Sequence, residues 1–166
     1  RAASGWRGIP RRMSACRIPL AGALAVRGLN AFARAALVMA VEKPERMTAA
    51  ARAGYLAPYD TWANRVAVLR FVQDIPLRAS HPSYRTLEEV EAGLAQFRHR
   101  PMLLVWGERD WCFTPRSREE FERRFPQAES FPIADAGHYV FEDAHERILP
   151  RLRAFLGAHP LTPEDA

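Results

Sequence analysis

The chain has 166 residues, of which 48% are hydrophobic and 26% are charged, and this balance is typical of a globular domain rather than of a disordered chain. The formal net charge is +5, but no recognised nucleic-acid-binding module accompanies it, so we expect no nucleic-acid partner. Two cysteines are too few for a disulfide framework, which favours a reducing, cytoplasmic location.

The first forty residues are strongly basic, because seven arginines precede the first acidic residue, Glu42. Their longest uncharged apolar run, Leu20 to Val26, is much shorter than the roughly 20 residues of a membrane-spanning helix. No initiator Met opens the chain, and no apolar region with a small-residue cleavage site follows the arginines. We therefore expect neither a transmembrane segment nor a secretory signal.

Helical patterns fill the first hundred residues, and no strand pattern interrupts them. Good helix formers dominate residues 29–41, which predicts a helix there. A second helix is predicted over 44–56, because Pro44 stands at its start, where proline is tolerated. The sequence therefore begins with a helical region rather than with part of a sheet.

Two further helices are predicted from capping residues. Asp60 suits the N-cap of a helix over 61–73, whose apolar residues recur at three- and four-residue spacing. Thr86 and Glu89 form a capping-box pattern that opens a helix over 87–97.

The second half of the chain changes its hydrophobic period. The predicted elements are, in order, a buried strand over 101–106, a helix over 116–125, a weaker strand over 129–133 and a closing helix over 143–156. We expect a bend at Pro150 and a frayed tail over 159–166, which is polar and rich in proline. Strands that alternate with helices indicate an α/β sheet.

Two residues with catalytic chemistry follow the predicted strands. Asp110 lies four residues after Trp106, and His138 lies five residues after Ile133. Functional groups gather at the carboxyl ends of parallel strands, so these strands would present a carboxylate and an imidazole at one edge. Such a pair suits an orienting acid and a general base. The ordinary alternative is a turn aspartate and a surface histidine, and spacing alone does not choose between them.

The residues around this pair resemble the C-terminal end of an α/β-hydrolase. The matching segments are "PMLLVWGERDWCFTP" and "FPQAESFPIADAGHYVFEDAHERILPRLRAFL". The resemblance implies a partial α/β-hydrolase fold, in which a helical cap precedes the last two parallel core strands and their helices. It also implies that Asp110 is the orienting acid and His138 the base. We therefore expect a cap over 1–80, part of the core over 81–158 and a tail over 159–166.

A narrower resemblance is to the haloalkane dehalogenase-like branch, and within it to the β-lactone decarboxylases of bacterial olefin biosynthesis. It rests on "VRGLNAFARAALVMAV", "GYLAPYDTWANRVAVLRFVQDIPL" and "GERDWCF". It implies decarboxylation of a long-chain cis-β-lactone to an alkene, no metal or organic cofactor, and partner enzymes of an olefin-synthesis assembly. Haloalkane dehalogenation and epoxide hydrolysis are the alternatives within this branch.

The nucleophile that this family requires is not found in the sequence. No G-x-S-x-G motif and no glycine-flanked aspartate elbow occurs. The chain is therefore interpreted as the C-terminal portion of a longer hydrolase, inactive by itself. A silent interaction module and a structural fragment without activity are the other function classes.

The remaining candidates are weaker. Trp111 follows the acid directly, and the helical cap carries aromatic residues that would suit a hydrophobic small-molecule substrate. The candidates for this lining are Trp111, Tyr55, Tyr59 and Trp62. Cys112 is not expected to be a nucleophile, because it shares the loop of the acid without a second histidine. The five histidines and two cysteines show no metal-ligand spacing.

Overall fold

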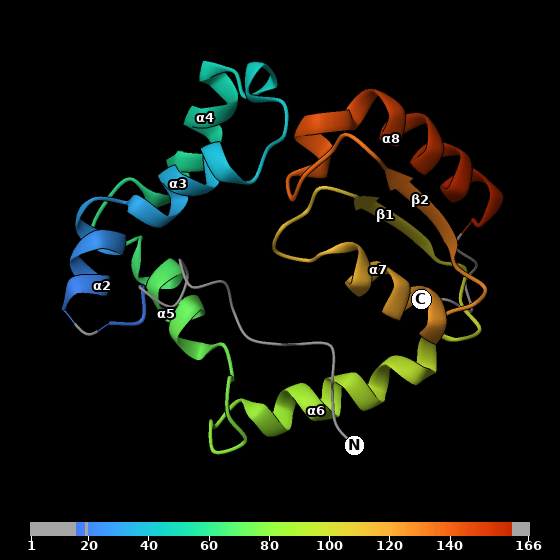
Figure 1. The fold of residues 1–166 in the computed structure, drawn as a ribbon, viewed down its shortest axis with the longest axis horizontal. Coiled ribbons are helices and arrows are strands. Elements are labelled where there is room, and N and C mark those ends of the chain that lie inside the picture. Colours follow the sequence, from blue (N-terminus) through green and yellow to red (C-terminus); the bar gives the residue numbers. More distant parts are fainter. Residues whose placement is uncertain (1–15, 19, 161–166) are drawn as a thin grey trace. The chain divides into compact units, whose positions relative to one another are not determined.

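The computed structural model of the protein describes residues 16–18 and 20–160, and its chain forms two compact units (Figure 1). The first unit contains the described residues up to Ala40 together with Pro44–Ala95, and the second contains Val41–Lys43 and the residues from Gln96 onward. The predicted boundary lies near residue 80, before the last helix of the first unit. Assignment of the units as cap and core stays a prediction.

The first unit is helical throughout its described residues, as the sequence predicts. Its elements are α2 (Ala21–Ala23), the π-helix η1 (Leu24–Gly28), α3 (Ala31–Met39), the 3₁₀ helix η2 (Pro44–Arg46), α4 (Ala49–Leu56), the 3₁₀ helix η3 (Ala57–Tyr59), α5 (Val66–Asp74) and α6 (Tyr84–Gly93), followed by the 3₁₀ helix η4 (Leu94–Phe97). The helix predicted over 44–56 is divided, because the Thr48 hydroxyl accepts a hydrogen bond from the amide of Ala51 at 3.1 Å and caps α4.

The predicted cap at Asp60 is wrong. Helix α5 begins only at Val66, and the Asp60 carboxylate accepts a hydrogen bond from the Asn64 side chain at 2.8 Å. The Arg65 guanidinium accounts for the later start of α5, since it donates hydrogen bonds to the carbonyl oxygens of Tyr59 at 2.7 Å and Asp60 at 2.6 Å. These bonds hold the chain before α5 as turns.

The predicted capping box is also wrong. Helix α6 begins at Tyr84, so Thr86 lies inside the helix rather than at its N-cap. Glu89 instead pairs with Arg85, whose Nε lies 3.0 Å from Oε1, one helical turn away. An exposed pair of this spacing stabilises a helix by about 0.3–0.5 kcal/mol.

No single helix among residues 16–18 and 20–160 is long and apolar enough to cross a membrane. Two consecutive helical segments, Ala21–Gly28 and Ala31–Met39, would together be long and apolar enough to cross a membrane, but the chain bends by 70° between them.

The second unit is an α/β unit around two parallel strands. It contains β1 (Leu103–Gly107), α7 (Pro115–Arg124), β2 (Glu129–Ile133) and α8 (Val140–Ala158). The strands pair in register from Leu103 opposite Glu129 to Gly107 opposite Ile133. Strand β1 starts two residues later than predicted, and most of it is only half-buried rather than buried. It has a single neighbouring strand within the described part of the chain.

The two helices of this unit cover opposite faces of the strands, as Figure 1 shows. Successive side chains of a strand point to opposite faces. Val105 and Ile133 pack with Ala144 and Ile148 of α8, whereas the Trp106 ring meets Phe121 of α7 at 6.2 Å between centroids. The core of the unit therefore lies between α8 and the strands.

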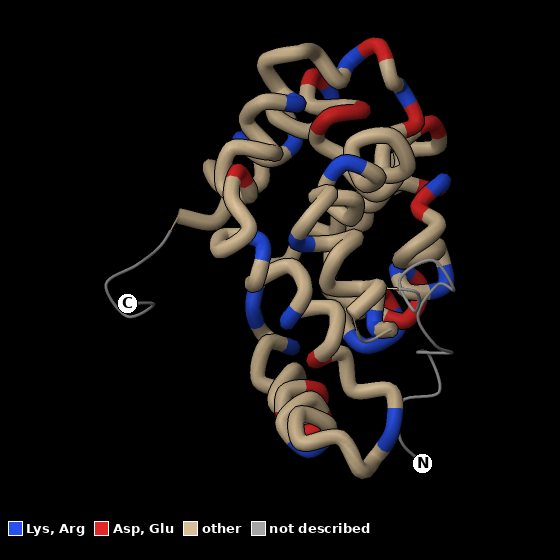
Figure 2. Tube along the Cα trace, turned by 90° about the vertical axis from the view of Figure 1, so that its left-hand side faces the viewer, with Lys and Arg blue, Asp and Glu red and all other residues tan. Residues whose placement is uncertain are grey.

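Basic and acidic residues are scattered along the described chain (Figure 2). In the second unit many of them pair. The Arg118 guanidinium contacts Glu108 at 3.0 Å and Glu122 at 2.5 Å. Pairs near the surface contribute about 0–1 kcal/mol each, so they adjust this fold rather than determine it.

The expected bend at Pro150 is wrong in position. Non-helical dihedral angles occur inside α8 at Ala144, with φ −152° and ψ 27°, whereas Pro150 lies in the helical part. Ala144 is fully buried and follows Asp143, which is also fully buried. The break thus lies where the first turn of α8 meets the core. Of the predicted tail, only residues 159 and 160 lie within the described residues.

The end of β1 passes very close to the loop after β2. A Cβ atom at Gly107 would lie 2.3 Å from the carbonyl oxygen of Gly137 and 2.5 Å from that of Ala136. Both obstacles are backbone atoms, which cannot rotate away as a side chain would. Only glycine allows this approach.

We predict that Gly107→Ala destabilises the second unit by about 1–3 kcal/mol, the usual cost of forcing extra atoms into a packed site. Urea unfolding followed by circular dichroism measures the change. Gly157→Ala is the matched control, because nothing lies within 4 Å of a Cβ there. It should be neutral or stabilising by up to about 1 kcal/mol, since alanine favours a helix. Equal stability of Gly107→Ala and wild type would contradict the close approach.

Candidate active site

Asp110 is held in a tight turn directly after β1. Its backbone amide donates to the carbonyl of Gly107 at 3.1 Å. Its Oδ1 accepts hydrogen bonds from the backbone amides of Cys112 at 2.7 Å and Phe113 at 2.9 Å. A short acidic side chain that bonds the backbone two residues ahead is a common way to stabilise a turn. The carboxylate is buried, and its orientation is determined by these bonds.

His138 lies in the loop between β2 and α8 and faces Asp110. Its Nδ1 is 2.9 Å from Asp110 Oδ2, within the range of a direct hydrogen bond. The expectation that the carboxylate and the imidazole lie at one edge of the strands is thus confirmed. The imidazole contacts the rings of Phe113 and Tyr139, with centroid separations of 5.5 Å and 6.0 Å. Its side chain remains 30% exposed, so the ring is accessible to a small molecule.

This pairing determines the tautomer of the histidine. An ionised carboxylate can only accept hydrogen bonds, so the proton of the pair belongs on Nδ1. The second ring nitrogen, Nε2, is then left as an acceptor. Such a histidine can take a proton at Nε2, and the adjacent carboxylate would stabilise the imidazolium that forms.

Backbone hydrogen bonds join the two loops directly. The amide of Glu108 donates to the carbonyl of Ile133 at 3.0 Å, and the amide of Arg109 donates to Ala136 at 3.0 Å. The two residues after β1 are therefore bound to the end of β2 and to the loop that follows it. The acid and the histidine are brought together by the backbone, rather than by their own contact alone.

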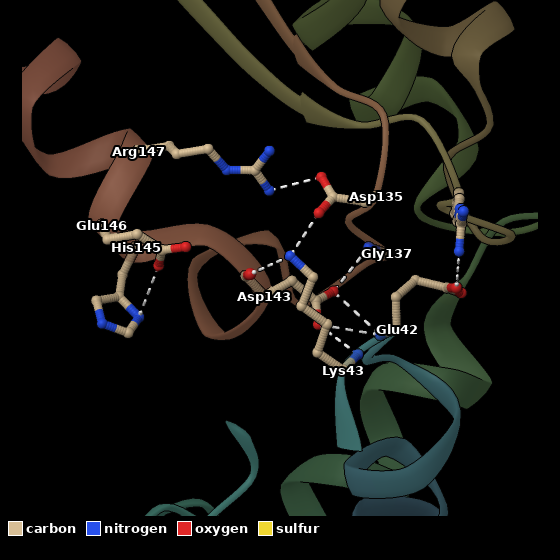
Figure 3. A network of polar contacts seen from close by, with 9 residues as sticks. Glu42, Lys43, Asp135, Gly137, Asp143, His145, Glu146 and Arg147 are labelled. Carbon is tan, nitrogen blue, oxygen red and sulfur yellow. Dashed lines mark hydrogen bonds and ion pairs between the residues drawn. The ribbon is translucent and has the colours of Figure 1, made fainter. Parts of the chain in front are cut away.

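A buried carboxylate that the sequence did not single out supports the histidine loop. Asp143 is fully buried, and its Oδ2 accepts a hydrogen bond at 2.7 Å from the amide of Gly137, next to His138. Its oxygens also accept bonds from the amides of Glu42 and Lys43, at 2.9–3.1 Å (Figure 3). The only sequence feature that could have drawn attention to Asp143 was its position in the first turn of α8, five residues after the histidine. The amide partners a hundred residues earlier could not be read from the sequence.

An ion-paired aspartate lies beside this network. Lys43 Nζ contacts Asp135 Oδ2 at 2.6 Å, and Arg147 contacts the other oxygen of Asp135 at 2.6 Å. The hydrogen bonds from Lys43 and then Arg147 hold the pKa of Asp135 well below its usual range. The exposed carboxylate of Asp135 therefore pairs with charged side chains, whereas the buried carboxylate of Asp143 accepts hydrogen bonds from backbone amides.

The predicted lining residues fall into two groups. Trp111 lies in the loop of Asp110, about a third exposed. The other three lie in the first unit: Tyr55 in α4, Tyr59 in η3 and Trp62 in the turn that follows. The Trp62 ring is covered by the Arg27 guanidinium at 4.4 Å from its centroid. The role of all four as a substrate lining stays a prediction.

Cys112 is a poor nucleophile in this environment. Burial, and then the charge of the neighbouring Asp110, raise the pKa of its thiol. A raised pKa leaves less of the reactive thiolate at neutral pH. Among residues 16–18 and 20–160, no group of three or more His, Cys, Asp or Glu side chains is arranged to hold a metal ion.

The sequence matches known proteins over most of its length. It fits the profile of the alpha/beta hydrolase fold family over residues 30–145. It is 44% identical over 136 residues to a cis-3-alkyl-4-alkyloxetan-2-one decarboxylase from Xanthomonas campestris pv. campestris, a match that covers 82% of this chain and 45% of that protein. A protein of the same name from Shewanella oneidensis is 35% identical over 148 residues, or 89% of this chain and 46% of the relative.

Solved structures of haloalkane dehalogenases share the fold. One assigned to an ancestral node, AncHLD2, is 25% identical with a TM-score of 0.73, and the match covers 89% of this chain and 52% of that one. DbeA from Bradyrhizobium elkani is 23% identical with a TM-score of 0.75, over 89% of this chain and 50% of the other. The chain thus spans about half the length of the proteins that it matches. With the family profile matched over residues 30–145, the chain belongs to the α/β-hydrolase fold family.

Proposed function

We propose that this chain supplies the acid–base pair of a cap-bearing α/β-hydrolase that acts on a hydrophobic substrate. The observation that carries the proposal is the hydrogen bond of 2.9 Å between His138 Nδ1 and Asp110 Oδ2 at the carboxyl ends of two adjacent strands. In this role His138 is the general base and Asp110 the residue that orients it. The nucleophile comes from residues outside this chain, whose length is about half that of its relatives.

The proposed reaction is the decarboxylation of a long-chain cis-β-lactone to an alkene. The support is the 44% identity to a relative named for this substrate class, a cis-3-alkyl-4-alkyloxetan-2-one. Splitting such a four-membered ring gives one alkene and one carbon dioxide, with no net uptake of water. Any proton that the base removes must therefore return within the same turnover.

The geometry suits such a base. Asp110 accepts two backbone N–H bonds at Oδ1 and faces His138 with Oδ2, so its side chain is held in one orientation against the ring. A fixed carboxylate favours the imidazolium at the moment when Nε2 holds the proton. The exposed face of the imidazole leaves room for water or for an acyl-enzyme group to approach.

A second candidate reaction is the dehalogenation of haloalkanes. The support is the 25% identity to the dehalogenase AncHLD2. The acid and the base would have the same roles in both reactions. The reactions are therefore distinguished by their products, which are an alkene from the lactone and a halide from the haloalkane. Epoxide hydrolysis, the other alternative in this branch, would give a diol.

The setting of the enzyme is also a proposal. The helical first unit acts as the cap, and the proposed substrate-binding residues are Tyr55, Tyr59, Trp62 and Trp111. The absence of a disulfide framework in a chain with two cysteines favours a cytoplasmic location. Enzymes that make β-lactones are the natural partners of one that consumes them in olefin biosynthesis.

We predict that this chain alone does not turn over a long-chain cis-β-lactone, because it lacks a nucleophile. Replacing the aligned segment of the Xanthomonas relative with this chain should restore alkene formation. Gas chromatography of the alkene measures the activity of the chain alone and of the chimera. The relative without its aligned segment is the control. Alkene formed by the chain alone, at a rate comparable to that of the chimera, would overturn the division of the site.

We predict that His138→Ala lowers kcat by about 10²–10⁴-fold, the usual contribution of a general base. The variant is made in the full-length product of the gene, and stability should change little, because the residue lies half-exposed in a loop. His145→Ala is the matched control, since His145 lies in α8 with a 59% exposed side chain. Assays follow alkene, halide and diol. Wild-type rates of His138→Ala on the substrate that is consumed would exclude it as the base.

We predict that Asp110→Asn lowers kcat somewhat less than His138→Ala does. The amide keeps the shape of the carboxylate but cannot stabilise an imidazolium, and it can hold the wrong tautomer. Steady-state kinetics of the same full-length protein measure the effect. Combined with His138→Ala, the second change should cost little more, because the two residues act as a unit. Additive losses in the double variant would contradict their coupling.

A further inference from the structure

Asp143 has a buried carboxylate, and both of its oxygens accept hydrogen bonds from backbone amides. None of its side chain is exposed. Oδ1 accepts from the amides of Glu42 at 3.0 Å and Lys43 at 2.9 Å, and Oδ2 accepts from Glu42 at 3.1 Å and Gly137 at 2.7 Å. Three backbone amides from two distant parts of the chain thus converge on a single carboxylate, as Figure 3 shows.

One of these amides belongs to the histidine loop. Gly137 immediately precedes His138, and its carbonyl oxygen is the atom that a Cβ at Gly107 would approach to 2.3 Å. The peptide before the histidine is therefore confined on one side by the end of β1 and held on the other by Asp143. A shift of this peptide would move the imidazole relative to Asp110.

The other two amides belong to a strap, which we define as residues Val41–Lys43. The strap also reaches the loop of the acid, because the Glu42 carboxylate contacts Arg109 Nη1 at 3.3 Å, one residue before Asp110. Lys43 Nζ adds a bond of 3.2 Å to the carbonyl of Asp143. The strap therefore contacts both loops that carry the acid–base pair, and Asp143 is its link to the histidine side.

We propose that Asp143 is a positioning residue for His138: by holding the amides of Gly137 and of the strap, its carboxylate sets the imidazole against Asp110. It acts through the backbone and does not contact a substrate. This inference rests on the proposed function of His138 as the base. Both side-chain oxygens of Asp143 are needed as acceptors, because the site offers them only hydrogen-bond donors.

The test compares Asp143→Asn with Asp135→Asn in the full-length product of the gene. Asparagine keeps the size of the side chain but has one acceptor oxygen, and its NH₂ group would face an amide donor. Asp135→Asn is the matched control. Asp135 is closer in sequence to His138 and contacts the same Lys43, but it binds the side chains of Lys43 and Arg147.

Two readouts distinguish positioning from general support. In protein with ¹⁵N-labelled histidine, the proton on His138 Nδ1 should shift or exchange faster in Asp143→Asn and stay unchanged in Asp135→Asn. In steady-state kinetics, kcat of Asp143→Asn should fall by about 10–100-fold with little change in KM, because a small displacement of a catalytic group is costly. The acidic limb of its pH profile, where a general base becomes protonated, should move as well.

Circular dichroism and the unfolding midpoint confirm that each variant is folded. If Asp143→Asn does not fold, Asp143→Glu is measured in the same way, since it keeps the charge and both acceptors but moves them by one methylene group. A folded Asp143 variant with the wild-type His138 proton signal and kcat within about twofold of wild type overturns the proposal. A changed signal in a protein that consumes none of the substrates supports positioning and overturns the proposed function alone.

Discussion

The parallel pairing of β1 with β2 is the constraint on which the candidate site depends. Register places Gly107 opposite Ile133. Backbone hydrogen bonds from Glu108 to Ile133 and from Arg109 to Ala136 then hold the loop after β1 against the end of β2 and its loop. A parallel pair brings both carboxyl ends to one edge. Asp110 and His138 then need only short loops to meet. The missing side chain of Gly107 is part of this constraint, because any Cβ there would separate the loops.

Two buried carboxylates complete the arrangement in different ways. Asp110 uses one oxygen for its own turn and offers the other to His138, so its charge faces the ring where a proton can be held. Asp143 uses both oxygens for backbone amides and has nothing left for a ligand. Burial of a carboxylate is costly unless donors surround it, and in both cases the donors are peptide groups. A backbone amide donor is kept in every substitution except one by proline, so these bonds do not depend on the side chains of the donor residues.

One edge of β1 has no neighbouring strand within the described residues, and this can be compared with the length of the related proteins. Within the described residues β1 has a neighbour on one side only, and most of it is half-buried. A strand with the apolar run "LLVW" usually lies inside a larger parallel sheet. The chain also spans about half the length of the proteins that it matches. Under the proposed function, the same absent residues would supply both the neighbouring strand and the nucleophile.

Local sequence determined much of this protein. The strand over 129–133 and the helices near 31–39 and 115–124 lie where composition and hydrophobic period predict them, because these signals depend on a few neighbouring residues. The location of Asp110 and His138 at one edge of the sheet was also predictable, since both residues follow predicted strands at short spacing, whereas their pairing was expected only from the family resemblance. Caps were less predictable. Asp60 and Thr86 have suitable side chains, but Arg65 and the earlier start of α6 decided otherwise.

Only the tertiary structure decided how the histidine loop is held. The amides that bind Asp143 belong to Glu42, Lys43 and Gly137, and no local pattern joins residues a hundred positions apart. Backbone amides are present in every residue type but proline, so the sequence carries no mark of which of them a buried carboxylate will meet. The break in α8 is a second example. Pro150 is visible in the sequence, whereas the non-helical dihedral angles occur at Ala144, where buried Asp143 and Ala144 enter the core. Sequence placed Asp110 and His138 after neighbouring strands, and packing over long distances determined what keeps them in place.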